Sequence, residues 1–213
     1  MSDFIAAFYV VILFVVIAVG FIIYVSVSSS RRMKEKRRHL ETPYRKIIDV
    51  IDRFPVYGPK DSVFFFDKER VRPRAMNYES AKHFLEDEIE KRKSERYKAF
   101  KEKGPSESSS EIIRADSASK SLWSLENEEE RYKKAVRELN SWTEAYSEKI
   151  SEYASDAVKQ DLDNIYDIIR DAYEVGNFLS VDGDQSKNRL KDAELRLVES
   201  MEDDIGVTLW RRK

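Results

Sequence analysis

The sequence predicts an all-α protein, and three features of the 213-residue chain indicate this class. Charged residues make up 37% of the chain, with only six glycines and five prolines, which is typical of long solvated helices. Apolar residues recur at intervals of three and four, as on one face of a helix. The start of the chain is strongly apolar. We therefore expect one N-terminal transmembrane helix, then a helical hairpin or short bundle with coiled-coil-like packing, with one short β-hairpin left open.

The N-terminal apolar segment, residues 4–25, holds twenty-two residues without a charged, amide or proline side chain. At about 1.5 Å per residue, such a helix crosses a hydrocarbon core of about 30 Å. We expect residues 1–3 to be an external N-terminus and residues 4–27 to form a transmembrane signal-anchor helix. Cleavage at the serines of 26–30, which would make this an exported helical protein, is a weaker alternative.

A basic segment, residues 28–41, follows the apolar one. Six basic side chains lie close to the end of the apolar segment: Arg31, Arg32, Lys34, Lys36, Arg37 and Arg38. Positive charge beside a membrane span favours the cytoplasmic side. We therefore expect a single-pass protein of the cell membrane, with its N-terminus outside and its C-terminal body in the cytoplasm. The lipids of an anionic leaflet are an expected partner, since each basic residue near such a surface contributes about 1 kcal/mol.

Residues 42–103 are expected to form membrane-proximal helices around an aromatic loop, 55–76. Thr42 and Pro43 fit the cap and first position of a helix that ends at Pro55. Its apolar face is expected to bury against the rest of the body or against the lipid surface. Asn77 fits the cap of a second helix that runs to about residue 103.

The aromatic loop contains three consecutive phenylalanines, Phe64, Phe65 and Phe66. Residues 63–66 have the composition of a short strand, although nearby prolines make an isolated hairpin marginal. Three adjacent side chains cannot all face one way in a helix or a strand. Core packing and a docking surface for a partner therefore both remain open for them.

The second half of the chain consists of a Ser-rich linker, 104–120, and an acidic helical region, 121–213. We expect a long helix over 121–175, ended by Gly176, and a C-terminal helix over 186–203. The apolar stripe of the long helix shifts around its axis near residues 155–160, which indicates a break or a change of packing partner there. Trp142 and Tyr146 on this stripe, and Trp210 near the C-terminus, are further candidates for docking a partner.

Charge is distributed unevenly: residues 1–104 carry 22 basic and 15 acidic side chains, and residues 105–213 carry 16 and 25. The acids that recur along the long helix have no histidine among them, as a carboxylate metal site would require. The chain has no cysteine, no phosphate-binding loop and no nucleophile elbow. We therefore predict no catalytic, cofactor or metal site, no enzyme, no nucleic-acid partner and no small-molecule substrate.

The remaining hypothesis is a single-pass membrane-anchored cytoplasmic adaptor or scaffold that recruits or positions an unidentified protein partner, with self-association left open. The alternative is a structural accessory subunit of a multiprotein membrane complex. Both rest on the expected anchor and the charged helices, and neither rests on a recognised motif.

Overall fold

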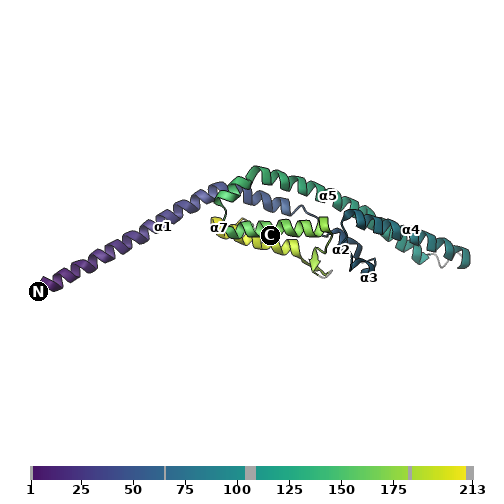
Figure 1. Cartoon of the computed structure of the whole chain (residues 1–213), viewed down its shortest axis with the longest axis horizontal. Helices are drawn as coiled ribbons and strands as arrows, with labels where there is room; N and C mark the ends of the chain where they lie inside the picture. Colours follow the sequence, from purple (N-terminus) through teal and green to yellow (C-terminus); the bar gives the residue numbers. More distant parts are fainter. Residues whose placement is uncertain (1, 65, 104–108, 182–183, 210–213) are drawn as a thin grey trace.

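The computed structural model describes residues 2–64, 66–103, 109–181 and 184–209. Within these ranges, the side chains of residues 2–16, 96, 99–100, 102–103, 109–116 and 185 lie outside the description. The described chain is mostly helical, with one small antiparallel sheet (Figure 1). The expected all-α bundle architecture is therefore confirmed at this level.

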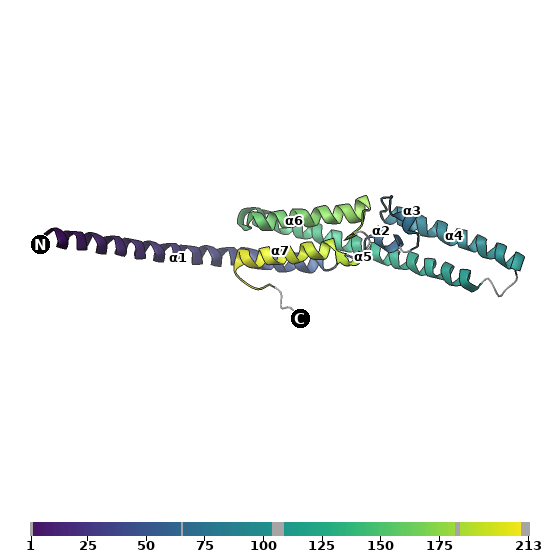
Figure 2. The same ribbon diagram turned by 90° about the horizontal axis from the view of Figure 1, so that it is seen from below.

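Helix α1 (Ser2–Ile51) is a single helix whose N-terminal part projects away from the rest of the molecule (Figures 1 and 2). The sequence suggested that a new helix begins at Thr42, but α1 continues through Pro43. The reason is the apolar stripe, which already starts at Leu40 and passes through Tyr44 and Ile47, all of them fully buried. Burial of this continuous stripe offsets the backbone hydrogen bond that a proline inside a helix removes.

The predicted membrane span is not supported. Among the residues whose side chains are described, no helix combines the length and the apolar character needed to cross a membrane. The described apolar run of α1 begins at Ile17 and gives way to serines and then to Arg31. Residues 4–16 of the expected span lie outside the described side chains. The assignment of a single-pass membrane protein with a cytoplasmic body is therefore corrected.

Four helical segments form what we call the body: α1 from Leu40 onward, α5 (Ser109–Tyr153) from Ala135 onward, α6 (Asp156–Ile169) and α7 (Arg189–Ile205). Helices α6 and α7 pack on each other, and α1 packs on both α5 and α7. The break expected near 155–160 lies between α5 and α6, where the Ser155 hydroxyl accepts a hydrogen bond from the backbone N–H of Val158. The chain turns back there, so the two apolar stripes meet different partners.

Helix α4 (Tyr78–Lys103) and residues 109–129 of α5 form what we call the arm, which extends from the other end of the body (Figure 2). Asn77 caps α4 as expected, since its side-chain oxygen accepts from the backbone N–H of Ser80 at 3.0 Å. The predicted linker differs from the structure. Residues 104–108 lie outside the described residues, and α5 is already helical from Ser109.

The segment between α1 and α4 forms two short helices, where the sequence had left a short strand open. Helix α2 (Pro59–Phe64) starts with proline at its first position, which is the position that tolerates it. Helix α3 (Lys68–Val71) is capped by the Asp67 side chain. The two-stranded sheet lies elsewhere, with β1 (Ser180–Val181) antiparallel to β2 (Asp184–Asn188). The helix-start residues Pro59 and Asp67 therefore outweighed the strand-like aromatic composition of this segment.

The joint between body and arm is built around Asp61 of α2 and the end of η1 (Arg170–Val175), a π-helical turn that continues α6. The buried Asp61 carboxylate accepts hydrogen bonds from the backbone N–H groups of Gly58 and Leu179 at 3.1 and 2.9 Å, and from Ser180. Gly176 has φ +88°, and any side chain there would meet the backbone of Met76. This close contact fixes the end of η1 beside the start of α4.

Candidate docking groove

Five of the six basic residues of the predicted juxtamembrane segment are exposed on α1 and Lys36 is half-buried; among the described residues, Lys36 and Arg37 form ion pairs. Lys36 Nζ lies 2.8 Å from the buried Asp204 carboxylate of α7, which also accepts from the Tyr44 hydroxyl. Arg37 pairs with Glu41, and hydrogen bonds from Arg37 and Arg45 hold the pKa of Glu41 below its usual value. Arg31, Arg32, Lys34 and Arg38 are exposed. Lys36 therefore has a structural role in joining α1 to α7.

The aromatic candidates separate into different environments. Phe64 is buried and contacts Phe178 edge-to-face, with ring centroids 5.0 Å apart. Phe66 is partly buried against the core. Phe65 and Trp210 lie outside the described residues. The structure thus places Phe64 and Phe66 in the packing of the joint, and it brings Trp142 and Tyr146 together in a surface groove.

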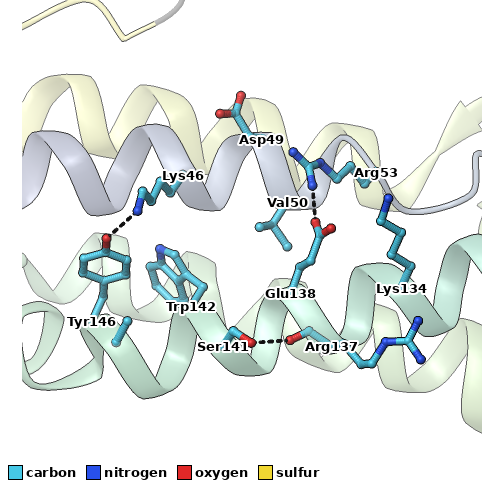
Figure 3. Close-up of a pocket in the computed structure, with 11 residues that line it drawn as sticks. Lys46, Asp49, Val50, Arg53, Lys134, Arg137, Glu138, Ser141, Trp142 and Tyr146 are labelled. Carbon is cyan, nitrogen blue, oxygen red and sulfur yellow. Dashed lines mark hydrogen bonds and ion pairs between the residues drawn. The ribbon is translucent and has the colours of Figure 1, made fainter.

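This groove, the α1–α5 groove, lies between the two helices and has a volume of about 740 Å³ (Figure 3). It is open to solvent and runs beside residues 46–53 and 134–146. Eleven residues line it: Lys46, Asp49, Val50 and Arg53 from α1 and the turn after it, and Lys134, Arg137, Glu138, Ser141, Trp142, Ala145 and Tyr146 from α5. Its size falls within the range of ligand-binding clefts, about 300–1,000 Å³.

The floor of the groove is apolar and held in a fixed position. Trp142 is 6% exposed, and its indole N–H donates to the carbonyl oxygen of Pro43 at 2.9 Å. This hydrogen bond joins α5 to α1 and holds the Trp142 ring at the bottom of the groove. Val50 of α1, 8% exposed, forms the opposite side of the floor. Tyr146 extends the aromatic surface, with its ring centroid 6.1 Å from that of Trp142.

The rims of the groove are charged, with four basic side chains against two acidic ones. Lys46 donates to the Tyr146 hydroxyl at 2.8 Å. Arg53 pairs with Glu138 across the groove. Lys134 and Arg137 are exposed, and within the described part of the chain neither forms an ion pair. The rims therefore present uncompensated positive charge to an incoming group.

Sequence reasoning identified Trp142 and Tyr146 but not the basic rims. The signal was present: Lys134, Arg137 and Ser141 step by three and four beside the buried stripe of Ala135, Leu139 and Trp142. On a helix, such residues lie at the edge of the buried face. What the sequence did not contain was the partner helix: Lys46 and Arg53 were expected on a separate helix from Thr42 to Pro55, and nothing indicated that this helix packs on α5.

Other chemistry is not concentrated in the part of the chain that the structure describes. No group of three or more histidine or acidic side chains there is arranged to hold a metal ion. The Glu128 carboxyl has its pKa raised by burial, and the Ser62 hydroxyl donates to it at 3.0 Å. No protein-family model, curated protein or solved structure matches the chain. The geometry of the groove therefore carries the functional argument.

Proposed function

We propose that the protein is a helical adaptor that binds an acidic segment of a protein partner in its α1–α5 groove. The observation that carries the proposal is the combination of an aromatic floor, Trp142 and Tyr146, with the exposed basic rim residues Lys134 and Arg137. Tryptophan, tyrosine and arginine are the residues that most often dominate the binding energy of protein interfaces. No membrane anchor is part of the proposal.

The chemistry of the partner follows from the lining. An apolar or aromatic side chain placed over Trp142 and Val50 removes apolar surface from water, at about 25 cal/mol per Å². Carboxylates on either side of it then reach the cations on the rims. Because these rim charges are exposed, they contribute mainly to association rate and specificity. An extended or helical acidic segment with one large apolar residue satisfies both requirements.

The preformed floor supports binding without rearrangement. The Trp142 ring is already held by its hydrogen bond to Pro43, and the Tyr146 hydroxyl is held by Lys46. Ordering a side chain on binding costs about 0.5–1.5 kcal/mol, so a floor that is ordered beforehand avoids this cost. The rim side chains are the groups that adjust to the partner.

The proposal is tested by fluorescence anisotropy of the full chain with a labelled synthetic peptide of glutamates and serines around one tryptophan. A matched peptide with lysine in place of glutamate is the ligand control. Changing Lys134→Glu together with Arg137→Glu should weaken binding about tenfold or more, equivalent to about 1.4 kcal/mol. Binding should also weaken as salt is raised, because exposed charges are screened.

The matched control variant is Lys98→Glu with Lys101→Glu, which reverses two exposed charges of the same spacing on α4. It should bind the acidic peptide as the unmodified chain does. Tyr146→Ala should weaken binding at low and at high salt, because it removes part of the apolar floor. Equal affinity for the acidic and the basic peptide would rule out the proposed recognition.

A structural subunit of a larger complex is the second candidate, and one observation favours it. Large apolar side chains on the projecting part of α1 are exposed: Ile17, Val19, Phe21, Ile22, Ile23, Tyr24, Val25 and Val27. Exposed apolar surface of this extent marks contact with another molecule. Recovery of the protein from its native source only as a fixed stoichiometric complex would favour this candidate over a reversible adaptor.

A further inference from the structure

A second surface of the molecule has the opposite character to the α1–α5 groove. On one side of the arm, Trp123 of α5 is 68% exposed. It lies in a shallow groove between α4 and α5 that is lined by three acidic side chains, Glu86, Glu90 and Glu126, and by one basic side chain, Lys93. We call this the arm surface. It presents a large aromatic ring surrounded by carboxylates.

We propose that the arm surface of one copy of the chain occupies the α1–α5 groove of a second copy, with Trp123 lying over Trp142 and Tyr146. This inference rests on the proposed function, because it names the acidic partner of that groove. The two surfaces are complementary in charge: three acids against one base on the arm, and four bases against two acids on the groove. The arm surface also supplies, in the exposed Trp123 ring, the large apolar side chain that the proposed partner of the groove requires.

Charge also selects the kind of contact. A symmetric dimer made by two arm surfaces would bring two sets of carboxylates together, and like charges facing each other across an interface are unfavourable. Two α1–α5 grooves would repel for the same reason. A head-to-tail contact, in which different surfaces meet, pairs the opposite charges instead.

The positions of the two surfaces determine the form of the assembly. Trp123 and Trp142 are 19 residues apart on α5, which corresponds to about 28 Å along the axis and about 100° around it. A copy whose groove is occupied therefore keeps its arm surface accessible, and a copy whose arm surface is bound keeps its groove accessible. Repeated head-to-tail contacts with this offset extend into a chain of copies unless the rotation happens to close a ring.

The chain has no cysteine, so single engineered cysteines report the contact without background. Ser124→Cys labels the arm surface beside Trp123, and Ser141→Cys labels the groove; both serines are exposed. The two full-length variants are treated with a short bismaleimide crosslinker, separately and as a mixture. A non-ionic detergent is added to cover the exposed apolar residues of α1, so that contacts through them do not contribute to crosslinking. We expect crosslinked pairs in the mixture and few in either variant alone.

Charge reversal then tests the recognition. Glu90→Lys with Glu126→Lys, introduced into the Ser124→Cys chain, should lower the yield of crosslinked pairs about tenfold. The matched control, Asp163→Lys with Glu199→Lys, reverses two exposed acids of α6 and α7 and should leave the yield unchanged. Combining the reversed arm with a groove that carries Lys134→Glu and Arg137→Glu should restore the yield.

Three results would overturn the inference: no crosslinking in the mixture, crosslinking of the Ser124→Cys variant with itself at equal yield, or no effect of the arm reversal. The peptide experiment separates this failure from failure of the proposed function. Absence of crosslinked pairs while the acidic peptide still binds would mean that the groove has a different partner. Failure of the peptide to bind would count against the groove itself.

Discussion

The body and the arm share helix α5, yet they are stabilised in different ways. In the body, α5 packs against a helix with a continuous buried stripe, and large side chains such as Tyr44, Ile165 and Leu197 are almost completely excluded from solvent. In the arm, the buried side chains of α4 lie in its first half, ending at Ile89. Beyond that residue, the described side chains of α4 are exposed apart from the half-buried Arg92.

Ion pairs partly compensate for the thin apolar seam of the arm. Glu129 of α5 pairs with Lys82 of α4 and with Lys133. Glu88 pairs with Arg92 at 2.8 Å, as the sequence spacing indicates. Such pairs contribute a few tenths of a kcal/mol each, whereas a buried leucine contributes several times more. We infer that the arm opens locally more often than the body does, with its base at the joint opening least.

The largest effect should come from a cavity in the body. Leu197→Ala removes a fully buried side chain of α7 and should lower the free energy of unfolding by about 3 kcal/mol. Leu125→Ala removes an equally buried side chain of the arm, and its effect should appear mainly as faster hydrogen exchange in α4. Urea unfolding and exchange measured on both variants make the comparison. Equal losses in global unfolding would mean that arm and body unfold as one unit.

The second largest loss of stability should come from a substitution in the joint. Asp61→Asn replaces one carboxylate oxygen with an amide N–H that faces the donors of Gly58, Leu179 and Ser180. Leaving buried donors without an acceptor costs about 1–3 kcal/mol, so we expect a loss near 2 kcal/mol in urea unfolding. The control Asp184→Asn changes an exposed acid that accepts from Ser186 and should cost less than about 0.5 kcal/mol. An Asp61→Asn variant as stable as the unmodified chain would show that the joint tolerates an amide at this position.

The sequence alone was sufficient where local signals decide the structure. Asn77 as a cap, the end of the long helical region at Gly176 and the change of stripe near Ser155 were all readable, because capping and helical periodicity act within a few residues. The same applies to Trp142, whose spacing places it on the buried face of α5. These features depend on neighbours in sequence rather than on partners in space.

Local rules failed where long-range packing overrode them. Pro43 has the signature of a helix start, yet α1 passes through it because the stripe that begins at Leu40 buries against α5 and α7. Lys36 has the signature of a membrane-flanking cation, yet it reaches the buried Asp204, 168 positions along the chain. The rims of the α1–α5 groove belong to the same group, since they exist only once two distant helices are side by side.

A pH dependence of intermediate size distinguishes the body further. Glu194 of α7 is 2% exposed, and burial raises its pKa above the usual 4.5, even though Lys191 donates to it at 2.7 Å; Asp52 faces the same pair. A carboxyl group with a raised pKa in the folded state binds more protons folded than unfolded. Its contribution to stability is therefore lost as pH rises from 4.5 through the raised pKa, by at most about 1.4 kcal/mol per pH unit.

Glu194→Gln removes this titration. The stability of the variant relative to the unmodified chain should therefore rise between pH 4.5 and pH 7, measured by urea unfolding at each pH. Glu199→Gln, which changes an exposed acid on the same helix, should follow the unmodified chain. A constant difference between the Glu194→Gln variant and the unmodified chain across this range would contradict the raised pKa.

The smallest effect should come from the ion pairs of the arm. Burial by itself would raise the pKa of Glu129, but hydrogen bonds from Lys133 and Lys82 outweigh it and hold the pKa below its usual value. Glu129→Gln weakens both pairs and should lower the free energy of local opening by about 0.5 kcal/mol, which speeds hydrogen exchange in α4 about twofold. The control Asp167→Asn, in an exposed pair between α6 and Arg170 of η1, should change nothing measurable.

Salt sharpens this last comparison between arm and body. At 1 M ionic strength the screening length falls to about 3 Å, so the difference between the Glu129→Gln variant and the unmodified chain should shrink. The effect of Leu197→Ala should stay the same, because it arises from lost apolar burial. If the Glu129→Gln difference persists at high salt, then the carboxylate stabilises the arm through hydrogen bonds that are partly shielded from solvent. The arm would then resemble the body more closely than its exposed surface indicates.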